Sequence, residues 1–127
     1  MLAPVEEARL AERLIAHDTS DAAGLAVASD FVAGWLEGRG AEVTRRTFAD
    51  REVLMASAGD GPVHIVFHGH LDVVPGHPEQ FTPRIEGDLL FGRGAYDMKG
   101  ALGAMMLALC DLVARPPDGA TVEFVMV

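Results

Sequence analysis

The sequence is poor in cysteine and in basic residues, and each shortage excludes a class of protein. A single cysteine, Cys110, cannot form an internal disulfide, which suits a reducing compartment. Only 10 Lys and Arg residues stand against 19 Asp and Glu, and the net charge of −9 argues against a nucleic-acid partner. We interpret the acidic excess as a solvated surface.

Long apolar runs and a leader-like start are also missing. No uncharged apolar run approaches the roughly 20 residues that cross a bilayer. Residues 1–7 lack the basic start and apolar centre of a signal peptide. We therefore expect a cytoplasmic protein with no membrane partner. Half of the 127 residues are hydrophobic, which is enough to build the core of a single domain.

Apolar periodicity predicts two helices, followed by strands that alternate with a further helix. The predicted helices cover residues 5–16, 22–38 and 98–114, and the predicted strands cover 42–48, 52–58, 63–67 and 121–127, with a small hairpin over 85–90. The strands over 63–67 and 121–127 are apolar enough for interior positions. This order predicts an α/β domain over residues 1–127, with helices flanking a layered parallel or mixed sheet.

Burial is predicted for two of these helices. The helix over 22–38 is expected to bury a stripe at helical spacing that comprises Val27, Ala28, Phe31, Val32 and Trp35. The helix over 98–114 is apolar nearly all round, so we expect it to be buried on most sides.

Two blocks between residues 63 and 100 carry the candidate chemistry. Gly-His-Leu-Asp-Val-Val-Pro (69–75) follows an apolar strand, and Gly-Arg-Gly-Ala-Tyr-Asp-Met-Lys-Gly (92–100) opens an apolar helix. Alternate strand residues point the same way, so His70 and Asp72 can face one side. A metal-binding histidine usually gives its other ring N–H to a carboxylate, a role open to Asp72. Asp97, at a helix start that favours anions, is expected to stay ionised and able to bind a cation.

Each block by itself also has a plainer interpretation. His70 and Asp72 suit a hydrogen-bonded structural pair, and Asp97 suits a helix N-cap. Arg93 and Lys99 are expected to form salt bridges that brace the turn, with substrate contact as the alternative. No nucleotide-binding loop, Gly-x-Ser-x-Gly elbow or Cys–His pair is visible, so neither a phosphate site nor a covalent nucleophile is predicted.

Together the two blocks resemble the dinuclear zinc amidohydrolases and metallopeptidases, the family of acetylornithine deacetylase, succinyl-diaminopimelate desuccinylase, aminoacylase and carboxypeptidase G. The resemblance implies that His70 binds one zinc ion and that Asp97 bridges two. It places Asp72 among the catalytic residues, as the carboxylate that orients the histidine. It also implies a zinc-exopeptidase-like catalytic domain that hydrolyses an amide bond of an N-acyl amino acid or small peptide through a metal-bridging water. Co²⁺ or Mn²⁺ would suit the same donors, and a homodimer is compatible with the complete protein.

The resemblance also implies site residues that this sequence does not contain. In the family, the remaining ligands and a general-base glutamate follow the strand that matches residues 121–127. The only adjacent glutamates here are Glu6 and Glu7, in the first predicted helix. We therefore interpret the chain as the N-terminal portion of a catalytic domain, inactive alone, without the inserted dimerisation domain and the C-terminal part. A truncated non-catalytic protein that folds with or binds a partner chain is the alternative, and a complete small metalloenzyme is a third.

Overall fold

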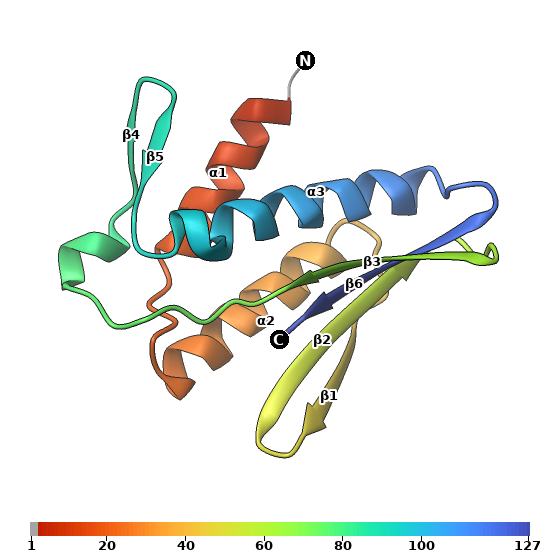
Figure 1. Cartoon of the computed structure of the whole chain (residues 1–127), viewed down its shortest axis with the longest axis horizontal. Helices are drawn as coiled ribbons and strands as arrows, with labels where there is room; N and C mark the ends of the chain where they lie inside the picture. Colours follow the sequence, from red (N-terminus) through yellow and green to blue (C-terminus); the bar gives the residue numbers. More distant parts are fainter. Residues whose placement is uncertain (1–2) are drawn as a thin grey trace. The chain divides into compact units, whose positions relative to one another are not determined.

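The computed structural model of the chain, which describes residues 3–127, contains every predicted helix and strand with shifted ends (Figure 1). The helices are α1 (Ala3–Ile15), α2 (Ala22–Glu37) and α3 (Gly100–Ala114), with the short helical turns η1 (Pro78–Phe81) and η2 (Ala95–Lys99). The strands are β1 (Thr44–Phe48), β2 (Arg51–Ala58), β3 (Val63–Gly69), β4 (Arg84–Glu86), β5 (Leu89–Phe91) and β6 (Ala120–Met126). None of the described helices has the length and apolarity that spanning a membrane requires.

The described chain divides into two compact units. The first, here called the site unit, comprises the described residues up to Ser29 together with His70–Ala104. The second, here called the sheet unit, comprises Asp30–Gly69 and Met105–Val127. The candidate chemistry of both sequence blocks falls within the site unit, apart from the glycine that opens the first block.

The sheet unit carries a four-stranded sheet in the order β1-β2-β6-β3. β2 pairs antiparallel with β1 and β6, and β3 pairs parallel with β6, which confirms the predicted mixed sheet. β6 is an interior strand, as predicted. Alternate residues point to one face of a sheet, and the buried face collects apolar side chains from β2 and β6: Leu54, Ala56, Ala58, Val122, Phe124 and Met126.

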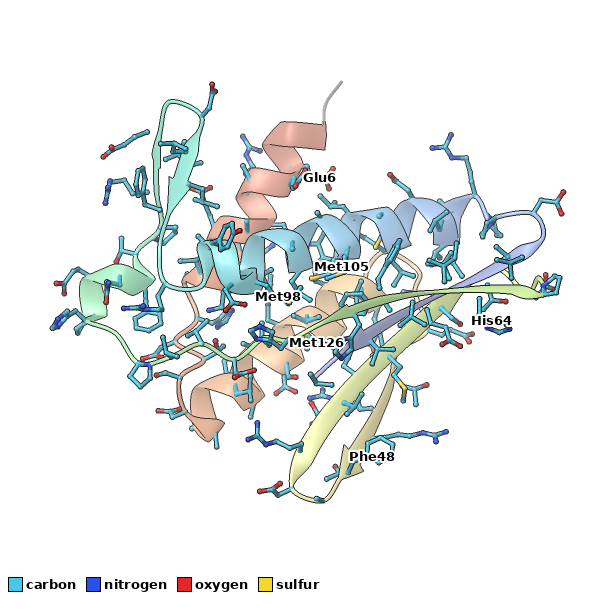
Figure 2. The ribbon with its side chains drawn as sticks, viewed as in Figure 1. Glu6, Phe48, His64, Met98, Met105 and Met126 are labelled. Carbon is cyan, nitrogen blue, oxygen red and sulfur yellow. The ribbon has the colours of Figure 1, made fainter. Side chains whose placement is uncertain are left out.

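The prediction of an interior position for residues 63–67 is wrong for the described strands. β3 lies at the end of the strand order, and Val63, Ile65 and Val66 are 58, 45 and 52% exposed. Phe48, at the end of β1 on the other edge, is also exposed (Figure 2). A strand with apolar side chains on both faces is typical of a sheet interior. Composition alone, however, does not indicate which strands pair with it.

Helix burial is narrower than predicted. Val27 is 59% exposed, although Ala28, Val32 and Trp35 of the predicted stripe are buried. In α3 only part of the surface is covered: Leu102, Met106 and Leu109 are fully buried, while most of its other apolar residues are half-buried. Apolar side chains that no other element covers stay partly accessible, so an apolar sequence alone overestimates the burial of a helix.

The site unit packs the second sequence block against α1. The apolar face of α1 buries Leu10, Ala11, Leu14 and Ile15. A Cβ atom at Gly92 would lie 2.4 Å from Cγ2 of Ile15, so only glycine allows this approach. The predicted hairpin is present as β4 and β5, with Gly87 at φ +58° in its turn. Residues 76–83, which precede the hairpin, contain the short helical turn η1.

Candidate metal centre

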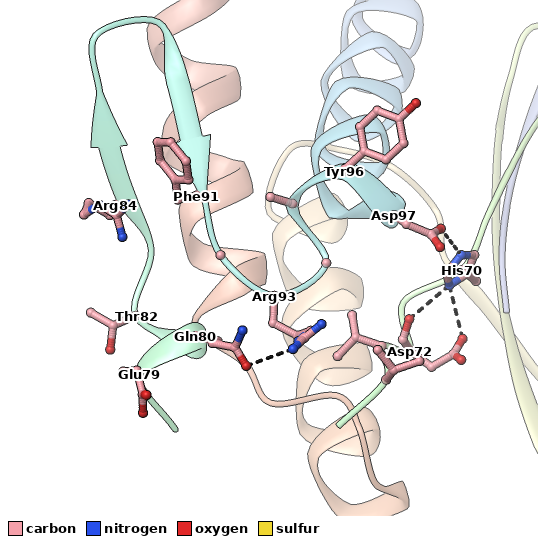
Figure 3. Close-up of a pocket in the computed structure, with 15 residues that line it drawn as sticks. His70, Asp72, Glu79, Gln80, Thr82, Arg84, Phe91, Arg93, Tyr96 and Asp97 are labelled. Atoms are coloured by element: carbon pink, nitrogen blue, oxygen red, sulfur yellow. Dashed lines mark hydrogen bonds and ion pairs between the residues drawn. The ribbon is translucent and has the colours of Figure 1, made fainter. Parts of the chain in front are cut away.

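The imidazole of His70 connects the two sequence blocks. Its Nε2 atom lies 2.9 Å from Oδ1 of Asp97, 27 residues further along the chain (Figure 3). Its Nδ1 atom lies 3.0 Å from the backbone oxygen of Asp72 and 3.3 Å from Oδ1 of the same residue. The structure therefore brings His70, Asp72 and Asp97 together. The contact of the ring with the Asp72 carbonyl oxygen was not predicted.

Asp97 does not begin α3, contrary to prediction. It lies inside η2 with φ −128° and ψ 89°, its peptide bond to Met98 is cis, and α3 begins only at Gly100. Its carboxylate is 79% exposed and faces His70. The thioether of Met98 (Figure 2) accepts the backbone N–H of His70 at 3.5 Å. The non-helical backbone of η2 thus turns the carboxylate towards the first block.

Opposing effects act on the pKa of His70. Burial of the ring disfavours the imidazolium and lowers the pKa. The hydrogen bond to the Asp97 carboxylate, the bond to the Asp72 carbonyl and the negative charges of both aspartates together outweigh burial, so the pKa lies above the usual 6.5. Because a metal ion binds neutral imidazole, a proton competes with it at this ring.

In the metal-free chain, Asp97→Asn is expected to lower the pKa of His70, because it removes the charged acceptor at Nε2. A group whose pKa is higher in the folded chain stabilises the fold at pH values below its unfolded-state pKa. This contribution is lost as the pH rises through the folded-state pKa. The pKa is measured by NMR titration of the ring, with Asp88→Asn in the hairpin turn as the control. A His70 pKa that Asp97→Asn leaves unchanged would contradict the contact.

Thr19 holds the first block in place. Its Oγ1 hydroxyl donates to the carbonyl oxygen of Leu71 at 2.7 Å, and its own carbonyl accepts the N–H of Val73 at 3.3 Å. The side chain is buried. These two bonds fix the backbone on both sides of Asp72. Thr19 was not among the residues that the sequence singled out.

Lys99 holds the second block to the same loop. It is the only lysine of the chain, and its side chain is fully buried. Its ammonium donates to the carbonyl oxygen of His17 at 2.8 Å. Burial lowers the pKa of Lys99 to about 8, although the charge of Asp18 acts to raise it. The main partner is thus a backbone carbonyl rather than the salt bridge that was predicted, and it anchors the chain two residues after Asp97.

Gly94 lets the two blocks approach each other. Its φ is +82°, and a Cβ atom there would lie 2.5 Å from Cγ1 of Val73. The carbonyl of Gly94 accepts the N–H of Lys99 at 2.8 Å. Glycine tolerates this backbone conformation and leaves room for the first block.

The donor atoms partly fit a metal ion. His70 Nε2 and Asp97 Oδ1 are 2.9 Å apart, whereas two ligand atoms around tetrahedral zinc are about 3.4 Å apart. A small rotation of the exposed Asp97 side chain would lengthen the distance between the two donor atoms to the tetrahedral value. Asp72 would hold Nδ1 in the way that a carboxylate holds the other ring nitrogen of a metal-bound histidine. Over residues 3–127 no group of three His, Cys, Asp or Glu side chains has a geometry that could hold a metal ion. The described chain therefore supplies two donors, fewer than a stable zinc site needs.

These residues line a pocket of about 720 Å³ within the site unit (Figure 3). Its lining includes His70, Asp72 and Asp97, and further charged side chains from Glu79, Arg84 and Arg93. The volume lies in the range of small-molecule sites. The arrangement can hold a small ligand beside the two donor atoms.

Comparison with known proteins identifies relatives of this chain. Residues 66–127 match the model described as peptidase family M20/M25/M40. The succinyl-diaminopimelate desuccinylase of Sphingopyxis alaskensis is 44% identical over 78 residues, which are 58% of this chain and 20% of the relative. That of Methylobacillus flagellatus is 38% identical over 117 residues, which are 86% of this chain and 30% of the relative. The chain thus spans less than a third of the length of these relatives.

Solved structures share the fold. The M20 family metallo-carboxypeptidase Sso-CP2 from Sulfolobus solfataricus matches with a TM-score of 0.82 at 22% identity, over 95% of this chain and 30% of that one. Human carnosine dipeptidase 1 matches with a TM-score of 0.78 at 22% identity, over 98% of this chain and 32% of that one. These likenesses confirm the predicted fold class, an α/β fold in which helices flank a mixed sheet.

Proposed function

Because this chain belongs to the peptidase family M20/M25/M40, we propose that it forms part of a metal-dependent hydrolase active site. The reaction is cleavage of an amide bond in an N-acyl amino acid or small peptide. The observation that carries the proposal is the convergence of His70 Nε2 and Asp97 Oδ1 at 2.9 Å, from separate sequence blocks. Both residues line the same pocket.

Each residue of the site has a distinct task in this proposal. His70 holds the metal through Nε2, and Asp97 holds it through its carboxylate. Zn²⁺ is the first candidate, and Co²⁺ or Mn²⁺ suit the same donors. The ion supplies Lewis acidity towards the amide carbonyl and towards water. Asp72 keeps the ring proton on Nδ1, which leaves the Nε2 lone pair available.

The named relatives and the pocket support the proposed substrate class. Relatives at 44% and 38% identity carry the name succinyl-diaminopimelate desuccinylase, so N-succinyl amino acids are the first substrates to test. N-acetyl amino acids and dipeptides are the next. A pocket of about 720 Å³ accommodates molecules of this size.

Hydrolysis by the native protein isolated from its source tests the proposal. We expect it to release free amine from at least one substrate class, to stop when a chelator removes the metal, and to resume when Zn²⁺ is restored. The 127-residue chain alone is expected to be inactive, since it supplies only two donors. Hydrolysis that persists in chelator would contradict a metal-dependent reaction. No hydrolysis, with a stable complex to another chain, would favour the non-catalytic alternative.

A further inference from the structure

The strand β3 leaves one row of backbone groups without a strand partner. Among the described strands only β6 pairs with it. At the start of β3 the N–H of Val63 donates to the carbonyl of Gly119 at 3.2 Å, and at its end the carbonyl of Gly69 accepts the N–H of Val127 at 2.9 Å. Successive residues of a strand direct these groups to opposite sides. The alternate residues between them therefore direct their N–H and C=O groups to the free edge: His64, Val66 and His68.

The two edges of the sheet differ in the features that prevent pairing between copies. Charged side chains and prolines on an edge strand oppose the addition of a further strand. β1, at one edge, carries Arg45 and Arg46. β3, at the other edge, contains no Lys, Arg, Asp, Glu or Pro, and its Val63, Ile65 and Val66 side chains are exposed. The edge formed by β3 is therefore open to a further strand.

The backbone of this edge is complementary to itself. In an antiparallel pair, two opposite residues that direct their backbone groups towards each other exchange two hydrogen bonds. When Val66 of one copy lies opposite Val66 of a second copy, His64 of each copy lies opposite His68 of the other. Every outward-directed residue of β3 then has a partner, whereas a shifted register leaves at least one of them without one. This arrangement has a two-fold axis at Val66 and closes on two copies.

The side chains match in the same register. Ile65 of one copy lies opposite Phe67 of the other, on the face of the sheet opposite to Val66. A β-branched side chain opposite an aromatic one stabilises a strand pair. On the other face the Val66 side chain, which is 52% exposed in the single chain, lies opposite its copy. Pairing therefore buries apolar surface that the single chain leaves accessible to water.

We propose that β3 is a docking edge for a second copy of this chain, which adds its own β3 antiparallel about Val66. A second copy is favoured over an unrelated strand because both the backbone groups and the side chains of the edge match under the two-fold axis. The net charge of −9 on each copy opposes association, but none of the Asp and Glu residues lies on β3. A single strand pair buries less than the roughly 1,200 Å² of a stable interface, so the dimer is weak and depends on concentration.

Sedimentation equilibrium of the 127-residue chain, up to millimolar concentration and at an ionic strength of about 0.15 M to screen the net charge, tests the docking edge. We expect a reversible equilibrium between monomer and dimer. Val66→Lys is expected to raise the dissociation constant about tenfold, because two ammonium groups would meet at the two-fold axis. Val66→Thr keeps a β-branched, uncharged side chain and is expected to keep the dimer. Thr47→Lys adds the same charge to β1, which is not part of the pairing, and serves as the matched control.

Disulfide cross-linking tests the register of the pair. The Cα atoms of a hydrogen-bonded antiparallel pair are about 5.5 Å apart, a separation that suits a disulfide. In a Cys110→Ala background, Val66→Cys is therefore expected to link two copies when oxidised glutathione is added. Val63→Cys is the control on the same strand. It is exposed as well, but it lies opposite Gly69 of the second copy and is expected to form few links.

The docking edge is overturned if the chain stays monomeric at millimolar concentration, or if Thr47→Lys weakens the dimer as much as Val66→Lys does. Equal cross-linking of Val63→Cys and Val66→Cys would contradict the register. Growth into larger assemblies would indicate pairing of unlike edges and would contradict the two-fold arrangement. Circular dichroism checks that Val66→Lys is folded, and if it is not, the cross-linking decides. None of these measurements depends on hydrolysis or on a metal ion, so their failure leaves the proposed function untouched.

Discussion

The free energy of unfolding of the metal-free chain is expected to rise by about 3 kcal/mol between pH 8 and pH 10.5 because of Lys99. The buried ammonium has a pKa of about 8, against the ordinary 10.5 of an exposed lysine. Between these values the unfolded chain binds more protons than the folded chain, so a rise in pH favours the folded state. Below and above this window the two states carry the same charge at Lys99, and the contribution is constant.

Two variants isolate this contribution from that of other groups. Urea unfolding at both pH values, in chelator, is compared between the original chain, Lys99→Met and Lys99→Arg. Neither variant titrates in the window, so both are expected to lack the rise. Because Lys99 is the only lysine, its ¹³Cε signal also reports the pKa directly. An ordinary lysine pKa, or an equal rise in Lys99→Met, would contradict the burial of this ammonium.

Gly94→Ala is expected to lower the free energy of unfolding by about 3 kcal/mol, because it combines backbone strain with a steric clash. The backbone at Gly94 has φ +82°, and the new methyl group would lie 2.5 Å from Cγ1 of Val73. Gly87→Ala is the matched control: its φ is +58°, but no atom lies within 4 Å of the added Cβ. We expect the control to cost about 1 kcal/mol.

The difference between the two alanine variants measures how closely the two sequence blocks pack. Denaturant unfolding of both variants and the original chain gives this difference. The clash is also expected to shift the ring signals of His70 in Gly94→Ala, because Val73 follows Asp72. If both variants lose the same free energy of unfolding and the His70 signals do not change, the Val73 side chain moves aside without an energetic penalty. Gly94 would then not position the site.

Features with a local cause were predictable from the sequence. Apolar periodicity predicted each helix and strand, and the spacing of His70 and Asp72 at a strand end predicted that the two residues interact. The edge position of β3 was not predictable, because an apolar strand does not specify its neighbours. The placement of Asp97 depends on the non-helical backbone of η2, which no periodicity indicates.

Long-range contacts of the site were also missed. The bonds of Thr19 to the first block and of Lys99 to His17 join segments 52 and 82 residues apart. No local pattern encodes such contacts. One signal was available for Lys99: a single lysine at the start of an otherwise apolar helical segment is expensive to bury unless a partner receives its charge. That signal indicated an internal partner for the ammonium but did not identify the partner.

Zinc titration of the 127-residue chain, followed at the ring ¹⁵N signals of His70, is the most direct test of the metal site. We expect Zn²⁺ to shift the Nε2 signal of His70, with an affinity weaker than micromolar because only two donors converge. Asp97→Asn should weaken this response, His70→Ala should abolish binding, and the ring of His77 should not respond. Micromolar or tighter zinc binding that survives His70→Ala would contradict the assignment of His70 and Asp97 as ligands.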